Sequence, residues 1–197
     1  MSAAVVRGLP GGEGAANAAG AAGASRVHAA WRALATVPDP ELPALTIADL
    51  GIVRLVAMRA DGVLDVGLSP TYTGCPATDL IAALARRALE DAAVGEFTVR
   101  QVLAPAWTSD WITSEGRRKL DAYGIVPPAS ASASASASAS AATSISSWRS
   151  SSSPLRVDCP RCRSARTEAT SEFGSTPCKA LHRCLDCLEP FERFKCI

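Results

Sequence analysis

The amino-acid sequence predicts an α+β protein, in which a two-layer domain of helices and strands is followed by a linker and a small cysteine-rich module. Three observations predict this organisation. Residues 26–128 alternate between helical and strand-like hydrophobic patterns. Residues 129–153 are almost entirely Ser and Ala, and residues 154–197 contain six of the seven cysteines. We therefore expect two folded parts of very different size.

The first 25 residues are rich in Ala and Gly and poor in large apolar side chains. Such a composition buries too little apolar surface to fold, so we expect a disordered tail over residues 1–25. The tail has a single Arg and no long apolar run, which disfavours a signal peptide. No stretch of the chain approaches the roughly 20 apolar residues that span a bilayer. We therefore expect a cytoplasmic protein.

The domain over residues 26–128 is predicted to have the element order α-β-β-α-β-α. Its helices show apolar residues at helical spacing, and we expect the last helix to be capped by Ser109 and stopped by Gly124. Asp61-Gly62 is a strong hairpin signal between the first two strands. The expected elements are a helix at 26–37, strands at 52–59 and 63–69, a helix at 76–92, a strand at 97–104 and a helix at 109–124. An antiparallel sheet of this size can bury one core under the helices.

The Ser/Ala run over residues 129–153 is predicted to be a flexible linker. Strict alternation has the period of a strand, but two such small side chains bury too little surface to hold one. A flexible coil of this length has an end-to-end distance of roughly 25–30 Å. We therefore expect the C-terminal module to sample many positions around the first domain. Trp148 has no evident role in a linker, and a docking contact is one hypothesis for it.

Two Cys-x-x-Cys pairs lie in the C-terminal module over residues 154–197, Cys159 with Cys162 and Cys184 with Cys187, separated by 21 residues. This pattern is typical of metal binding in a reducing compartment. Two residues between thiols let one tight turn present both sulfurs to a tetrahedral ion, and four thiolates select zinc or iron. We predict a structural zinc ion in a zinc ribbon, where the metal supplies much of the stability.

An alternative at this metal site is an iron–sulfur cluster, which also uses four cysteines. Cys178 and Cys196 supply two further thiols to the module. His182 is expected on the surface rather than as a ligand. The cysteine pattern therefore indicates a metal strongly, but it says little about what the metal does.

Cys75 is the sole cysteine of the first domain and lies in SPTYTGCPATDL, between a strand and a helix. Pro76 suits the first helical position, which would place Cys75 at the helix N-terminus. There the helix dipole and free backbone N–H groups would lower the pKa of the thiol. A reactive thiolate and a buried, inert cysteine both remain open. A catalytic Cys–His pair is disfavoured, because His28 and His182 are distant in sequence.

Three other loops carry polar residues that could meet Cys75 at one end of the sheet. These residues are Asp39 and Glu41 in PDPEL, Asp49 in ADLG, and Thr108, Ser109 and Asp110 in APAWTSDW. Helix capping is the favoured role for the last group, and Asp39 between two prolines suits an ordered turn.

The charge of the chain is nearly balanced, with 20 basic and 19 acidic residues. Net charge therefore gives no support for nucleic acid or a membrane as the main partner. Basic residues in the ribbon alternate with acidic ones, so no basic stripe forms.

The segments DPELPALTIADLGIV, PTYTGCPATDLI and APAWTSDWIT resemble the metal–sulfur cluster biosynthesis domain, a family of iron–sulfur assembly factors with a compact α+β fold. That family has a cysteine in the loop that Cys75 occupies here. FGSTPCKALHRC and CLDCLEPFERFKCI narrow the resemblance to proteins that accompany the phenylacetyl-CoA 1,2-epoxidase of aerobic phenylacetate degradation. The resemblance covers about residues 26–128 and 154–197.

The resemblance implies an accessory, non-catalytic role in maturing this multicomponent monooxygenase. It implies two partners, a diiron oxygenase and a reductase with a flavin and an iron–sulfur cluster. A transient iron–sulfur cluster would be transferred by Cys75, with Asp49 and the segment Thr108–Asp110 shaping its pocket. In agreement, the sequence has no diiron carboxylate helices, dinucleotide fingerprint or flavin motif. The other hypotheses are a structural docking subunit, a nucleic-acid-binding zinc ribbon and a stand-alone thiol enzyme.

Overall fold

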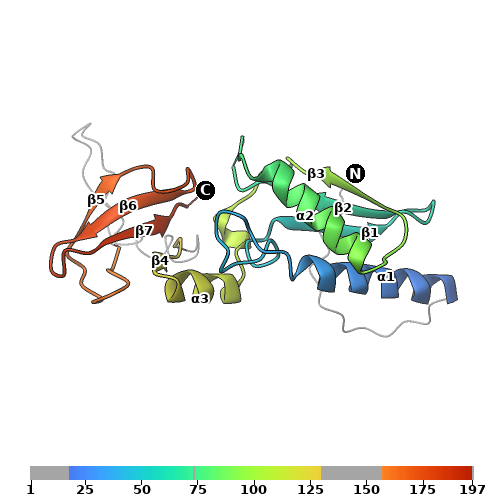
Figure 1. The fold of residues 1–197 in the computed structure, drawn as a ribbon, viewed down its shortest axis with the longest axis horizontal. Helices are drawn as coiled ribbons and strands as arrows, with labels where there is room; N and C mark the ends of the chain where they lie inside the picture. Colours follow the sequence, from blue (N-terminus) through green and yellow to red (C-terminus); the bar gives the residue numbers. More distant parts are fainter. Residues whose placement is uncertain (1–17, 73, 130–156, 197) are drawn as a thin grey trace, which may run out of the picture. The chain divides into compact units, whose positions relative to one another are not determined.

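The computed structural model describes residues 18–72, 74–129 and 157–196 (Figure 1). The chain divides into two compact units, Met1–Gly116 and Arg117–Ile197. Helices and sheets occur together in the described residues, which confirms the predicted α+β class. Within these ranges, no helix has both the length and the apolar character that crossing a lipid bilayer requires.

The first unit contains two helices that pack on a three-stranded sheet of order β1-β2-β3 (Figure 1). Its core includes Ile81, Ala85 and Leu89 from one face of α2 and Leu64 and Val66 from β2, all buried. In chain order, the elements are α1 (Ala18–Leu34), β1 (Val53–Met58), β2 (Leu64–Leu68), α2 (Thr78–Asp91), β3 (Phe97–Gln101) and the 3-10 helix η1 (Ser109–Trp111).

The sheet of the first unit is mixed. β1 and β2 form the expected antiparallel hairpin, whose turn contains Gly62 at a φ of +83°. β2 and β3 are parallel, so the prediction of an antiparallel sheet was wrong for this pair. The chain crosses back through α2 between these strands, and such a crossover joins parallel neighbours. As a result, the carboxyl ends of β2 and β3 lie at the same edge of the sheet.

Helix α1 begins at Ala18, inside the segment that was predicted to be a disordered tail. Alanine is the strongest helix former, so an Ala-rich segment can extend a helix that is anchored further along. The anchor is Arg26, whose guanidinium donates hydrogen bonds to the carbonyls of Val94, Gly62 and Glu96 at 2.6, 2.8 and 2.9 Å. These bonds tie α1 to the hairpin and to the turn before β3. Residues 1–17 lie outside the described ranges.

The helix expected over residues 109–124 is split into two. Thr108, not Ser109, caps η1, because its side chain accepts a hydrogen bond from the backbone N–H of Asp110. The α-helix α3 follows at Ser114–Ala122, and Gly124 at a φ of +84° stands just beyond its end, as expected.

The second unit contains a four-stranded sheet of order β4-β7-β6-β5. β5, β6 and β7 form an antiparallel meander, and β4 pairs in parallel with β7 through Ile125 opposite Glu192 and Val126 opposite Arg193. The strands are β4 (Ile125–Val126), β5 (Thr167–Ser171), β6 (Lys179–Cys184) and β7 (Pro190–Phe194). A small cluster of buried residues, Val157, Cys159, Cys184 and Phe191, packs with the partly buried Val126.

The Ser/Ala run lies between two strands of one sheet. β4 precedes it and β5 follows it, and both strands belong to the second unit. Ala129 and Val157, the described residues on either side of the gap, line the same pocket. In the chain, the run therefore stands between β4 and β5 of one sheet, and its role as a linker between residues 128 and 154 stays a prediction. Residues 130–156, including Trp148, lie outside the described ranges.

Candidate functional site

The four cysteines of the two Cys-x-x-Cys pairs form one cluster in the second unit. Their sulfur atoms all lie within 4.8 Å of one another. The Sγ atoms of Cys159 and Cys187 are 3.7 Å apart, and those of Cys162 and Cys184 are 3.5 Å apart. Zinc–sulfur bonds of about 2.3 Å in a tetrahedron place sulfurs about 3.8 Å apart. The donor set therefore fits one tetrahedral zinc ion.

The same distances bear on the alternative of an iron–sulfur cluster. Cysteines that hold a cluster must enclose several iron and sulfide ions, so their sulfurs lie further apart than around one ion. Each pair supplies one buried and one exposed cysteine, Cys159 with Cys162 and Cys184 with Cys187. The geometry therefore favours a single ion that lies between the core and the surface.

Backbone N–H groups prepare Cys184 to bind a cation as a thiolate. The N–H groups of Asp186 and Cys187 donate to its Sγ at 3.4 and 3.5 Å. These bonds, that of Cys187 first, lower the pKa of Cys184 to about 6. Cys187 keeps its proton, because burial and the neighbouring thiols outweigh the Glu189 N–H and raise its pKa to about 12. A metal ion must displace that proton, so binding releases protons.

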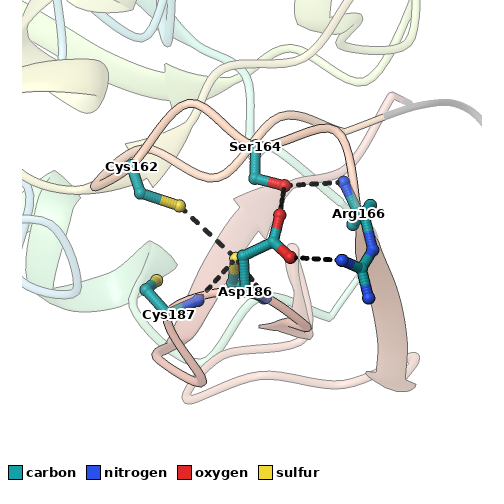
Figure 2. Close-up of polar contacts among 6 residues, drawn as sticks. Cys162, Ser164, Arg166, Asp186 and Cys187 are labelled. Carbon is teal, nitrogen blue, oxygen red and sulfur yellow. Dashed lines mark hydrogen bonds and ion pairs between the residues drawn. The ribbon is translucent and has the colours of Figure 1, made fainter.

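Asp186 joins the two cysteine turns (Figure 2). Its carboxylate accepts a hydrogen bond from the Ser164 hydroxyl and pairs with the Arg166 guanidinium at 2.7 Å. Ser164 in turn accepts a hydrogen bond from the Arg166 backbone N–H at 3.0 Å. The second turn is thereby held to the chain that follows the first. Contacts between distant turns leave no local pattern in a sequence, so this role of Asp186 was not predicted.

The remaining thiols of the ribbon lie outside the four-sulfur cluster. Cys178 is buried with its Sγ 3.0 Å from the Thr176 hydroxyl oxygen. Cys196 is exposed and accepts a hydrogen bond from the Arg193 guanidinium at 3.5 Å.

His182 is buried, so its predicted surface position was wrong. It points to the same side of β6 as Cys184, and its ring stacks on Phe191 with centroids 5.6 Å apart. Burial, with a smaller contribution from Arg193, lowers the pKa of its imidazole.

Cys75 lies in the first unit, partly buried, in the loop between β2 and α2. Helix α2 begins at Thr78 after the cap residue Ala77, so Cys75 is not at the helix N-terminus as predicted. Its carbonyl accepts hydrogen bonds from the Thr78 N–H and hydroxyl at 3.2 and 2.8 Å. The Cys75 loop is therefore a turn that leads into the helix.

The prediction of a lowered Cys75 pKa was also wrong. Burial raises the pKa of this thiol, and the negative charges of Glu41 and Asp39 raise it further. The Ala77 N–H and Thr78 oppose this shift without overcoming it. Asp39 and Glu41 of the PDPEL loop therefore act on the Cys75 thiol through their charge. Cys75 is thus a protonated thiol in an acidic surrounding at neutral pH.

Asp39 orders its own turn, as expected. Its Oδ1 accepts hydrogen bonds from the backbone N–H groups of Glu41 and Leu42 at 2.9 and 2.8 Å. Asp49 acts similarly, because its Oδ2 accepts from the N–H and hydroxyl of Thr46 at 2.9 and 3.0 Å.

The ADLG loop also docks on the segment that contains Thr108, Ser109 and Asp110. Trp107 Nε1 donates to the carbonyl of Leu50 at 3.0 Å, and the Thr113 N–H donates to the carbonyl of Asp49 at 2.9 Å. Gly51 has a φ of +66°, and a Cβ atom there would lie 2.4 Å from the Trp111 carbonyl oxygen. Only glycine fits this close approach.

Two known families match the chain. Residues 28–104 match the family described as "Iron-sulfur cluster assembly protein". Residues 143–195 match the "PaaD zinc beta ribbon domain". The described part of the second match contains all four clustered cysteines.

Curated and solved proteins resemble the chain to different extents. A protein of Porphyromonas gingivalis, "Fe-S protein maturation auxiliary factor", is 33% identical over 90 residues, which cover 45% of this chain and 85% of that protein. A solved structure from Bacillus anthracis, a "Domain of Unknown Function DUF59", has a TM-score of 0.47 and 24% identity and covers 51% of this chain and 95% of its own.

A protein of Escherichia coli K12 matches along both units. It is described as a subunit of a "Putative 1,2-phenylacetyl-CoA epoxidase" and is 45% identical over 172 residues. The match covers 87% of this chain and 94% of that protein. With an assembly-type first unit and a zinc ribbon in the second, the chain belongs to the family of phenylacetyl-CoA epoxidase subunits that carry the PaaD zinc ribbon.

Proposed function

We propose that this protein is an accessory factor in iron–sulfur cluster assembly that serves a phenylacetyl-CoA epoxidase in phenylacetate catabolism. The observation that carries the proposal is the union of two matches in one chain, an iron–sulfur assembly family over residues 28–104 and a zinc ribbon over residues 143–195. A relative named as a subunit of that epoxidase matches along both units. The protein is not itself an enzyme in this proposal.

Its partners are the oxygenase and reductase subunits of the epoxidase. The reductase is the recipient of the iron–sulfur cluster, and the oxygenase is the component to which the matured reductase delivers electrons. The zinc ion of the ribbon has a structural role, because cysteine sulfurs supply all four of its ligands.

Cys75 is the ligand that carries the transient cluster. Its partial burial and its acidic neighbours favour the protonated thiol. An iron atom of the cluster must displace this proton to bind, and a returning proton then favours release of the iron to a recipient thiolate. A ligand of this kind suits transfer better than permanent storage. Asp49 and the segment Thr108–Asp110 shape the pocket of Cys75 in this proposal. They do so by ordering their own turns, since Asp49 accepts a hydrogen bond from Thr46 and Thr108 accepts one from Asp110.

The test is to replace Cys75 by Ser in the full chain and to purify the reductase from cells that produce the variant. We expect reductase with much less iron and acid-labile sulfide, and weak visible absorption from its cluster. The variant itself should keep its zinc content and its thermal unfolding midpoint, because Ser is nearly isosteric with Cys.

Cys196→Ser is the matched control, since Cys196 is also outside the four-sulfur cluster. It should leave the cluster content of the reductase unchanged. A fully loaded, active reductase from cells with Cys75→Ser would contradict the proposed role of Cys75. Tight association of the variant at fixed stoichiometry with an active epoxidase would then favour a structural docking subunit.

A further inference from the structure

Two leucines are exposed on the second cysteine turn, Cys184-Leu185-Asp186-Cys187-Leu188. Leu188 is 67% exposed and Leu185 is 38% exposed. They flank Cys187, and the turn is held at both ends, by the metal ligands and by the bond from the Cys184 N–H to the Glu189 carbonyl at 3.0 Å. Isolated exposed leucines need no explanation, but two on one rigid turn form an apolar tip. We call Leu185 and Leu188 the leucine tip.

The backbone of Leu188 is strained. Its φ is +61°, in the left-handed region that is sterically unfavourable for a non-glycine residue. Glycine would adopt this conformation without strain. Packing of the side chain within the unit offsets little of this strain, because two thirds of Leu188 is exposed. The geometry of the cysteine turn imposes this conformation, and it holds the exposed Leu188 side chain in one position.

The residue at the equivalent position in the first cysteine turn has its side chain bound within the unit. Arg163 follows Cys162 and also has a positive φ, +60°. Its guanidinium pairs with Asp121 at 3.1 Å, so the strained residue there anchors the turn to α3. The strained residue of the first turn therefore makes a contact within the unit, whereas the strained residue of the second turn is exposed to solvent.

The charges beside the leucine tip are paired within the ribbon. Arg161 pairs with Glu189 at 2.6 Å, and Asp186 pairs with Arg166 at 2.7 Å. These pairs leave no excess of basic side chains that would attract a nucleic acid or an anionic membrane. The complementary surface is therefore an apolar pocket with little net charge on a protein.

We propose that the leucine tip docks this protein onto the phenylacetyl-CoA epoxidase complex, with Leu188 as an anchor in an apolar pocket of a partner subunit. This inference rests on the proposed function for the identity of the partner. Two leucines are far too little surface for a stable homodimer, which needs an interface of about 1,200 Å² or more. They suit one anchor in a pocket, where a few residues carry most of the binding energy.

The experiment measures binding of the full-length protein to the purified oxygenase–reductase complex by calorimetry at low and high salt. Leu188→Gly removes the side chain and relieves the strained φ. We expect its dissociation constant to rise about tenfold or more, while its zinc content stays the same and its thermal midpoint stays equal or rises. Leu188→Ala, which keeps the strained backbone, should lose affinity equally.

Leu103→Ala is the matched control, because Leu103 is 64% exposed but lies in the first unit. It should bind as the unsubstituted chain does. The proposal is overturned if the unsubstituted chain does not bind, if Leu188→Gly binds within twofold of it, or if high salt abolishes binding. Loss of a self-associated dimer in Leu188→Gly would also overturn it, since the partner would then be a second copy.

The docking surface and the proposed function can fail separately. If Leu188→Gly binds normally while Cys75→Ser still leaves the reductase without its cluster, only the docking surface is wrong. If Leu188→Gly loses binding while Cys75→Ser supports a loaded reductase, the docking surface stands and the cluster-transfer role falls.

Discussion

Lys179 and Glu192 form a nearly buried ion pair in the second unit. Lys179 Nζ lies 2.8 Å from Glu192 Oε2, with the lysine side chain 4% exposed. The other carboxylate oxygen accepts a hydrogen bond from the Ser175 N–H. A buried charge is tolerated when its partners satisfy it, and it destabilises the fold when one partner is removed. The pair therefore holds the FGSTPC turn to the sheet.

This ion pair predicts a pH dependence of stability. Burial alone would raise the pKa of Glu192, but Lys179 and the Ser175 N–H outweigh it and hold the pKa below its usual 4.5. A carboxyl with a lower pKa in the folded state contributes stability above about pH 4.5 and loses it as the pH falls through the folded-state pKa. We expect Glu192→Gln to destabilise the second unit by about 2 kcal/mol at pH 7.

The measurement is the thermal midpoint of both proteins between pH 7 and pH 3.5. The difference between the thermal midpoints of the unsubstituted chain and of Glu192→Gln should become smaller as the pH falls below 4.5. Loss of zinc in acid affects both proteins, so the difference between them isolates the carboxyl. A gap that stays constant over this range would show that Glu192 does not carry the effect.

Individual residues were the hardest features to predict. The four clustered cysteines follow from spacing alone, because a Cys-x-x-Cys turn is a local structure. The raised pKa of Cys75 depends on burial and on Glu41, which is distant in sequence, so local pattern suggested the opposite. His182 was misplaced for a similar reason, since only its position in β6 opposite Phe191 buries it.

At the scale of elements, the two cysteine turns and the sheet of the ribbon depend on each other. Two of the four residues in its buried cluster, Cys159 and Cys184, are also metal ligands. All four cysteines of the metal cluster lie in the second unit, whereas the first unit has its own core of helices on a sheet. Stability therefore comes from metal in one unit and from packing in the other.

Metal removal should consequently unfold one unit alone. We expect a strong zinc chelator to collapse the dispersed amide NMR signals of residues 157–196, while those of the first unit remain. Adding zinc back in excess should restore them. Dispersed signals from β5, β6 and β7 after complete metal removal, verified by elemental analysis, would contradict this expectation.

Most helices and strands were predictable, because their hydrophobic periods are local. The direction of β3 was not, since it depends on how the chain returns through α2. β4 was missed because a strand of two residues, Ile125 and Val126, has no period to detect. The split of the last helix at Ile112–Thr113 follows from packing on the ADLG loop, which periodicity does not report.

At the scale of the whole molecule, the Ser/Ala run stands in the chain between β4 and β5, two strands of one sheet. Composition identified its limits, but composition cannot say which parts of the fold a segment connects. The domain limits at 128 and 154 remain predictions from composition. The structure divides the chain between Gly116 and Arg117.

This organisation predicts that the run can be shortened without harm. Deleting residues 131–140 shortens a segment that leaves and re-enters the same unit, so zinc content and reductase maturation should not change. The loop-closure entropy predicts a change in the free energy of unfolding of about half a kcal/mol or less. Calorimetric unfolding measures the change in the free energy of unfolding, and the iron content of the reductase measures its maturation. A loss of maturation in a stably folded deletion variant would show that the run has a role of its own.

The pairing of β4 with β7 also determines where the protein can be cut. A fragment that starts at Pro154 keeps every cysteine of the zinc cluster but loses β4. β7 would then present unpaired N–H and C=O groups along one side, and such a bare edge invites strands from other molecules to add to the sheet. A truncated ribbon is therefore prone to aggregate while still holding its metal. A fragment that begins at Arg117 keeps that edge covered.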